Sequence, residues 1–183
     1  MRTPGTWLLL GFGLVSCTSD TTPTVYVGLS YQIRCLDCQP RALDDVARNV
    51  KAVDEEAGHR LACRVEDRDG TKRVTFSLAH DSSDETKNYS LRVNNGNLTG
   101  GTDDPCELTI VEGANTYKGG CSSEEPNADR PCQVSFELDR SVLRGSLYCN
   151  NIGNEATANV TRYVVAPLSR EPVKFEIYGC TGL

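Results

Sequence analysis

The stretch CQVSFELDRSVLRGSLYC, residues 132–149, decides the fold of this chain. Apolar and polar residues alternate on both sides of its centre, Arg140-Ser141, as they do in two half-buried strands. If the chain reverses there, one face of the hairpin becomes apolar. The pairs expected on that face are Val134 with Leu147, Phe136 with Gly145, and Leu138 with Leu143. The segment therefore predicts an antiparallel β-hairpin.

Two other pairs fit the same register. Glu137 falls opposite Arg144 on the polar face, which is a favourable cross-strand pair. Cys132 and Cys149 fall opposite each other at the open end of the hairpin. We therefore expect a disulfide between these two cysteines.

The same register holds around Gly113-Ala114. Reversal there sets Ile110 opposite Tyr117 and Cys106 opposite Cys121, which predicts a second disulfide. The pair Cys121–Cys132, across the polar loop 122–131, is the alternative that the sequence leaves open.

Two more turns have the residues that two-residue hairpins favour. Asp69-Gly70 sets Val65 opposite Val74 and Cys63 opposite Phe76, and Asn95-Gly96 sets Val93 opposite Leu98.

Further strands are expected at 25–34, 159–165 and 173–178. One α-helix is expected over 43–57, where apolar residues follow helical spacing between Pro40 and Gly58. About nine short strands separated by turns predict a mainly β fold, an antiparallel β-sandwich or barrel-like domain with one α-helix, stapled by disulfides.

The bulk properties limit the function. The 183 residues carry a formal charge of −6 with a pI near 5.0, which argues against a nucleic-acid partner because such a partner requires a basic surface. Residues 25–183 are expected to form one domain with its own core.

The N-terminal residues have the order of an export signal: Arg2, then an apolar run over 7–13. The tetrad Leu14-Val15-Ser16-Cys17 that follows resembles the lipobox of bacterial lipoprotein precursors. The resemblance implies a signal peptide over 1–16, a lipid on Cys17 and a polar tether over 17–24. Thr18 after the cysteine favours the outer membrane of the cell envelope over the inner membrane.

The cysteine count agrees with this interpretation. The chain has nine cysteines, an odd number for an exported protein, and assigning Cys17 to lipid leaves eight for four disulfides. By elimination, the last two bonds would involve Cys35, Cys38, Cys63 and Cys180.

Cysteine-ended hairpins, together with Tyr117, Gly119 and the C-terminal run 175–180, are also similar to small mycobacterial lipoprotein antigens.

Catalytic and metal-binding patterns are weak. Cys35-Leu36-Asp37-Cys38 has the spacing of a redox pair, but the hairpins after it do not fit a thioredoxin fold. No second close cysteine pair completes a zinc site, and His59 and His80 are isolated in the sequence. The run His80–Glu85 reads as a solvated loop, because catalytic triads are assembled across a fold. We therefore expect no metal and no cofactor.

The sequence thus predicts a lipid-anchored, non-enzymatic envelope protein that binds an unidentified protein, glycan or lipid partner, or has a structural role. The loops 81–87, 100–105 and 122–131 are the expected display surfaces. The alternatives are a thiol–disulfide oxidoreductase that uses Cys35 and Cys38, and a carrier of a small apolar ligand.

Overall fold

The computed structural model describes residues 24–36, 46–98, 105–155, 162–166 and 173–183. Within these ranges the chain is mainly β, with eleven strands, one 3₁₀ turn and no α-helix. The elements are β1 (Tyr26–Cys35), β2 (Val46–Val53), β3 (His59–Arg68), β4 (Thr71–His80), η2 (Glu85–Lys87), β5 (Tyr89–Asn97), β6 (Cys106–Glu112), β7 (Asn115–Ser122), β8 (Cys132–Asp139), β9 (Val142–Asn154), β10 (Arg162–Ala166) and β11 (Val173–Tyr178).

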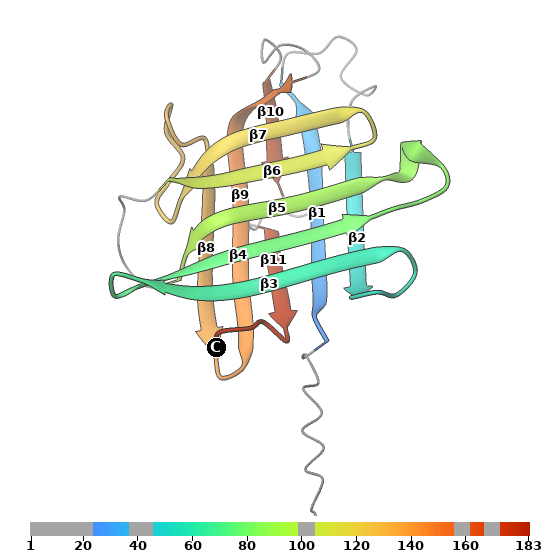
Figure 1. Cartoon of the computed structure of the whole chain (residues 1–183). Coiled ribbons are helices and arrows are strands. Elements are labelled where there is room, and N and C mark those ends of the chain that lie inside the picture. Colours follow the sequence, from blue (N-terminus) through green and yellow to red (C-terminus); the bar gives the residue numbers. More distant parts are fainter. Residues whose placement is uncertain (1–23, 37–45, 99–104, 156–161, 167–172) are drawn as a thin grey trace, which may run out of the picture.

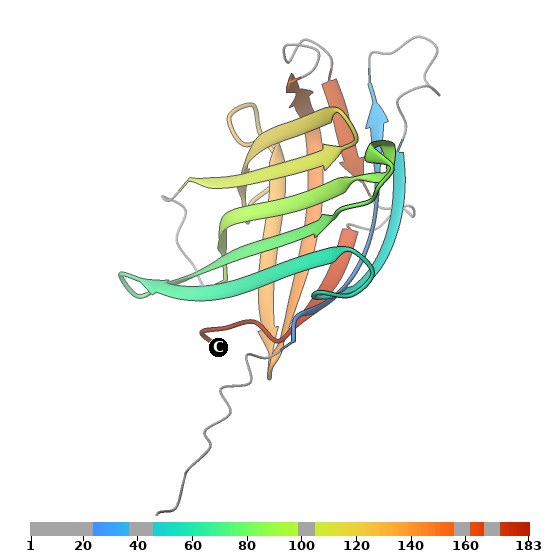
Figure 2. The ribbon, with the colours of Figure 1, turned by 45° about the vertical axis from the view of Figure 1, so that its right-hand side comes forward.

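The strands form one hydrogen-bonded path in two layers. Its order is β10-β1-β11-β9-β8-β7-β6-β5-β4-β3, and β2 pairs with β1. Strands β3–β7 form the front layer and cross steeply over the back layer, which contains β8, β9, β11, β1 and β2 (Figures 1 and 2). The path passes between the layers through a short parallel pairing of β7 with β8, which has only two register pairs.

A row of four cysteines marks this junction. Cys106, Cys121, Cys132 and Cys149 are directly opposite one another across β6, β7, β8 and β9. The disulfides are Cys106–Cys121 and Cys132–Cys149, the two bonds expected from the hairpin registers, although Cys121 also neighbours Cys132. Covalent bonds therefore lie on both sides of this short parallel pairing.

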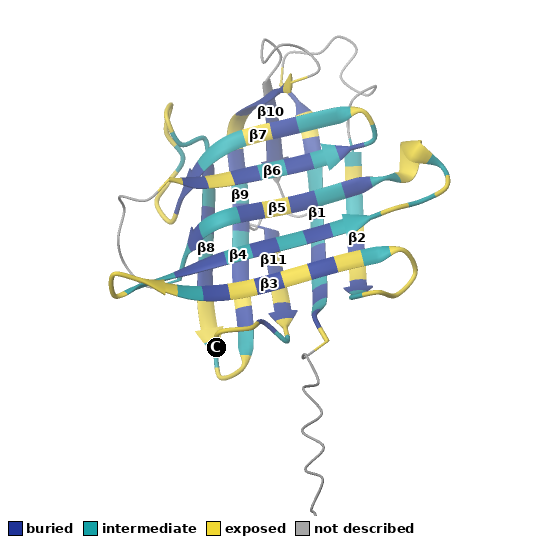
Figure 3. Cartoon of the chain, viewed as in Figure 1, coloured by how far each residue is buried: buried dark blue, intermediate teal, exposed yellow. Residues whose placement is uncertain are grey.

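The core lies between the layers, where every second residue of most strands is buried (Figure 3). Phe76 of the front layer stacks on Phe175 of the back layer, with 6.1 Å between ring centroids, and Phe136 meets Phe175 edge-on at 5.7 Å. Gly145 makes room for this cluster, because a Cβ there would lie 2.2 Å from the Phe175 ring.

The expected helix over 43–57 is wrong wherever the structure describes it. Residues Val46–Val53 form β2, which pairs with β1 through eight register pairs. Val50 and Ala52 are buried, two positions apart, as in a strand. Apolar residues at 46, 50 and 53 fit helical spacing as well, but all three are β-branched valines, and pairing with β1 overrides the weak helical preference.

The expected hairpin at Asn95-Gly96 is also wrong. Gly96 lies within β5, where it pairs with Val74, and Val93 pairs with Leu108 of β6 instead of Leu98. A Cβ on Gly96 would lie 2.3 Å from the Phe136 ring. The glycine therefore permits a close approach between layers, and the register shift beside it in the β4–β5 pairing is a bulge rather than a chain reversal.

The hairpins at the other three turns have the expected registers, including Cys63 with Phe76, Ile110 with Tyr117 and Val134 with Leu147. Strand β11 has the expected bounds, and β10 covers the described part of the segment expected over 159–165.

The C-terminal residues protect the outer edge of β3. The disulfide Cys63–Cys180 fixes them there, and Thr181 accepts a hydrogen bond from the Val65 amide at 2.8 Å and donates one to the Cys63 carbonyl at 3.0 Å. Nearer the start of β3, the Asp54 carboxylate accepts from the Leu61 amide at 2.7 Å. Unpaired edge strands invite pairing with other chains, and these contacts occupy part of that edge.

No helix in the described ranges has the length and apolar character needed to cross a bilayer.

Candidate binding site

A trench lies on the outer face of the back layer, over β8, β9 and β11. Its volume is about 620 Å³, and its lining residues are Ser135, Phe136, Glu137, Arg144, Gly145, Ser146, Lys174, Phe175 and Glu176. The phenylalanine side chains point into the core, so the trench meets only the polar side chains and the backbone at these positions. This size is within the range of small-ligand sites.

Strand register explains the hollow. Ser135 of β8 lies opposite Ser146 of β9, which lies opposite Lys174 of β11. The two serine hydroxyls are hydrogen-bonded at 2.7 Å. Because serine is short, the Ser135–Ser146 pair forms a floor beside the longer side chains of Glu137, Arg144 and Lys174.

One wall of the trench is a row of alternating charges. Glu137, Arg144 and Glu176 lie side by side across β8, β9 and β11. The Arg144 guanidinium contacts Glu176 at 3.1 Å and Asp139, beside the hairpin turn, at 2.7 Å. This arginine is therefore held in place from both sides.

The charged wall also fixes protonation states. The hydrogen bond from Arg144, followed by one from the Tyr178 hydroxyl, lowers the pKa of Glu176 below its ordinary value. The same carboxylate, together with Asp139, raises the pKa of Arg144. Glu176 and Arg144 therefore face each other as an ion pair at neutral pH.

Tyrosines border the trench on the same outer face. The Tyr178 hydroxyl donates to Glu176 at 3.1 Å, and its ring lies 5.7 Å from that of Tyr26. Tyr148, paired with Gln133, is in the row beyond the serine floor.

A second polar cluster lies between the layers. His59, His80, Tyr89 and Glu112 are opposite one another in a single row across β3, β4, β5 and β6. They point inward, since the neighbouring inward positions, such as Leu78, are buried. The apolar core ends at this row.

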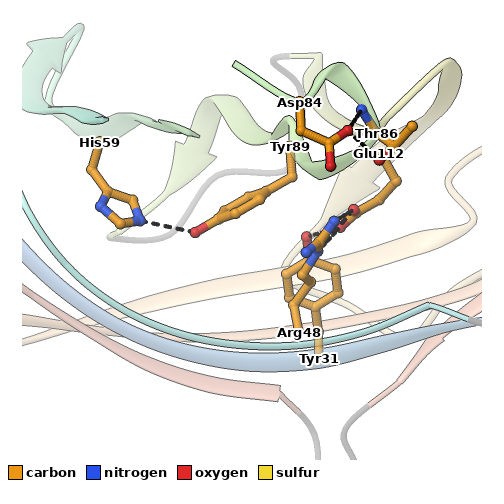
Figure 4. Close-up of polar contacts among 7 residues, drawn as sticks. All are labelled: Tyr31, Arg48, His59, Asp84, Thr86, Tyr89 and Glu112. Carbon is orange, nitrogen blue, oxygen red and sulfur yellow. Dashed lines mark hydrogen bonds and ion pairs between the residues drawn. The ribbon is translucent and has the colours of Figure 1, made fainter. Parts of the chain in front are cut away.

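Tyr89 is the centre of the polar row (Figure 4). Its ring stacks on His80 at 5.1 Å, and the Arg48 guanidinium lies 4.7 Å from its centroid on a cation–π contact. His59 Nδ1 lies 3.0 Å from the Glu56 carbonyl, which can only accept, so Nδ1 donates there. His59 Nε2 therefore accepts from the Tyr89 hydroxyl at 3.0 Å. Burial raises the pKa of Tyr89, which keeps this donor protonated.

Glu112 joins the two layers (Figure 4). Its carboxylate is almost fully buried and accepts from the Tyr31 hydroxyl of β1 at 2.6 Å and from Arg48 Nη2 of β2 at 2.6 Å. Burial and the nearby Glu112 charge raise the pKa of Tyr31, and the hydrogen bond to Glu112 raises that of Arg48. Because Tyr31, Arg48 and Glu112 satisfy one another, they fix the two layers against each other.

The two histidines, which are isolated in the sequence, are therefore neighbours in the structure. Their rings lie 4.7 Å apart, because they pair directly across β3 and β4. His80 faces His59 and Tyr89 rather than the serines that follow it. The Ser82 hydroxyl instead accepts from the Asp84 amide, and Asp81 pairs with Arg60. No catalytic triad forms at this position.

The other expected site residues are placed as follows. Cys35 is disulfide-bonded, and its partner lies outside the described residues, as do Cys38 and Cys17. Of the expected display loops, 100–104 lies outside them too. The loop 81–87 contains η2, which Asp84 caps by accepting from the Thr86 amide and hydroxyl (Figure 4). The loop 122–131 is largely exposed. Among the described residues, no group of three or more metal-ligating side chains forms.

Sequence reasoning found neither the trench nor the polar row as a site. The register of the 132–149 hairpin does place Glu137 beside Arg144, which is one signal of the charged wall. The contact between Arg48 and Glu112 joins residues that no local pattern relates.

Comparisons with protein-family models, with curated proteins and with solved structures find no match to this chain.

Proposed function

We propose that this chain is an exported, lipid-anchored protein of the cell envelope, whose β domain is a rigid, non-enzymatic binding module. The tetrad 14–17 supports the anchor, with the lipid on Cys17 and the outer membrane as the favoured location. The outer-face trench is the surface that we propose for binding.

The state of the cysteines carries this proposal. All seven cysteines in the described ranges are disulfide-bonded. Stable disulfides are typical of oxidising compartments outside the cytosol, so they support export. Six of the seven pair among themselves, which leaves Cys38 as the partner we propose for Cys35 and leaves Cys17 for lipid.

The two crossing layers support a more specific architecture. We propose an orthogonal β-sandwich in which β7 and β8 form the corner, with the cysteine row at the turn between sheets. In such a sandwich the interior is filled by side chains. The many fully buried core residues, Tyr31, Phe76 and Leu108 among them, argue against a carrier with an apolar interior pocket.

The anchor is tested by comparing the wild type with Cys17→Ser in a bacterial host fed radiolabelled palmitate. We expect labelled wild-type protein in the membrane fraction, and an unlabelled Cys17→Ser variant in the soluble fraction. Thr18→Ser serves as the control and should stay labelled. A Cys17→Ser variant that is still labelled, or a wild type without label, would disprove the lipid anchor.

A thiol–disulfide oxidoreductase remains the second candidate, since Cys63 and Cys180 pair with each other and do not take Cys35. It predicts a Cys35 bond that is reduced before the other three. Differential alkylation at increasing dithiothreitol concentration measures the order of reduction, and reduction of Cys35 only together with the buried bonds would exclude this candidate.

A further inference from the structure

We propose that the outer-face trench binds a neutral oligosaccharide. This inference rests on the binding role proposed above and names the ligand class of that site.

Charge balance is the first argument. The trench is lined by two carboxylates, Glu137 and Glu176, and two cations, Arg144 and Lys174, in a chain whose overall charge is −6. A site for an anionic or cationic ligand would carry an excess of the opposite charge. This trench has no such excess, so a ligand without net charge fits it best.

Hydrogen-bonding capacity is the second argument. The trench offers hydroxyl groups that both donate and accept, carboxylates that accept, and cations that donate. Sugar hydroxyls need donors and acceptors side by side, which the Ser135–Ser146 floor and the charged wall supply. The wall is also held in place before binding. Ion pairs with Glu176 and Asp139 fix Arg144, and a hydrogen bond from Tyr178 fixes Glu176. Groups held in this way lose little freedom on binding.

The remaining features disfavour other ligands. The central strand under the trench, β9, is paired with β8 on one side and β11 on the other, so a peptide cannot add a strand along it. The Tyr26–Tyr178 pair beside it offers aromatic surface against which a pyranose ring can pack.

The test is titration calorimetry of the full chain, extracted from membranes in a polyoxyethylene detergent, since glucoside detergents would compete. The neutral probes are triacetylchitotriose, cellotriose and maltotriose. The charged probes, glucosamine trimer and trigalacturonate, have the same ring number. We expect at least one neutral trisaccharide to bind about tenfold or more tightly than both charged ones.

Variants locate the binding. Ser146→Tyr fills the floor and Arg144→Ala removes the centre of the wall, and each should weaken binding about tenfold or more. Arg64→Ala removes a comparable exposed arginine, paired with Glu66 on the front layer, and should leave the affinity unchanged. Circular dichroism tests whether each variant is folded. If Ser146→Tyr is not folded, Arg144→Ala alone decides the outcome.

Two results would overturn this inference: no neutral trisaccharide binding with a Kd below about 10 mM, or binding that Arg144→Ala leaves intact. Its failure is separable from failure of the proposed function. A chain that is palmitoylated and membrane-bound but binds no sugar keeps its anchor and loses only this ligand class.

Discussion

The imidazole ring of His59 lies against that of His80, with 4.7 Å between their centroids, because the two residues are directly opposite in the β3–β4 pairing. The row continues through Tyr89 to Glu112, where Arg48 and Tyr31 of the back layer meet it. A single polar row therefore joins the layers at the end of the apolar core.

Removing only one partner of the buried ion pair between Arg48 and Glu112 should destabilise the domain strongly. Arg48→Met leaves the Glu112 carboxylate buried with only Tyr31 as a partner, and we expect a loss of about 3 kcal/mol in the free energy of unfolding. Urea denaturation measures this loss.

The matched variants separate charge from contact. Tyr31→Phe removes one hydrogen bond to the buried carboxylate and should cost about 2 kcal/mol. The double variant Arg48→Met/Glu112→Leu should cost less than Arg48→Met alone, because no unpaired charge is left. A double variant that is less stable than the single one would show that the ion pair itself stabilises the domain.

The disulfides should differ in their effect on stability. Cys63–Cys180 joins residues 117 positions apart, whereas Cys132–Cys149 joins residues 17 apart. In the chain-entropy model, the longer loop contributes about 1.7 kcal/mol more. Thermal or urea unfolding of Cys63→Ser/Cys180→Ser should therefore show the larger loss.

Loss of the Cys63–Cys180 bond has a further consequence that loss of Cys132–Cys149 lacks, because it releases the C-terminal residues from β3. The edge of β3 that Thr181 covers becomes available for strand pairing. We expect Cys63→Ser/Cys180→Ser to form concentration-dependent dimers in analytical ultracentrifugation, while Cys132→Ser/Cys149→Ser stays monomeric. Monomers in both cases would mean that the edge of β3 is protected even when the C-terminal residues are not tied to it by a disulfide.

The contact between Arg144 and Glu176 in the trench should be lost only in strong acid. Arg144 lowers the pKa of Glu176 below the ordinary 4.5, so the contact persists as pH falls past 4.5 and is lost only at more acidic pH. Its stabilising contribution is therefore present above 4.5 and disappears as pH falls through the folded-state pKa. Carboxyl-carbon NMR measures the midpoint.

Arg144→Ala provides the check on the cause. The Glu176 midpoint should rise towards 4.5, whereas that of Glu66, lowered by Arg68 on the front layer, should not move. A Glu176 midpoint that stays low in this variant would assign the shift to Tyr178 instead.

Two glycines test the packing of the aromatic cluster. Gly145→Ala places a methyl group 2.2 Å from the Phe175 ring, and we expect a loss of about 1–3 kcal/mol from overpacking. Gly28→Ala in β1 is the control, because the nearest atom to a Cβ there is the Tyr26 hydroxyl oxygen at 3.8 Å. It should leave stability unchanged or raise it slightly. Equal losses at both positions in urea denaturation would contradict this account.

Much of the sheet could be predicted from local sequence. Where a turn separates two alternating segments, counting outward from it gives the register, as around Arg140-Ser141 and Gly113-Ala114. The register also predicts the disulfide Cys132–Cys149, because these two cysteines are at the ends of one such hairpin.

The errors arose where local patterns are ambiguous. Val46, Val50 and Val53 fit a helix as well as a strand, and only the neighbouring β1 decides between them. Gly96 has the signature of a turn, but the contact that requires a glycine comes from Phe136 of another layer. The meeting of Arg48 with Glu112 depends on how the layers cross, and no spacing in the chain encodes that crossing directly.

The close contact between the two ends of the described domain has a practical consequence. A Cβ on Gly179 would lie 2.3 Å from the Thr24 carbonyl, so the chain enters and leaves the domain at the same pole (Figure 1). With lipid on Cys17, the seven residues up to Thr24 extend at most about 25 Å. A reporter protein fused after Leu183 would therefore begin within a few nanometres of the bilayer, and cell-surface display would be better served by insertion into the loop 122–131.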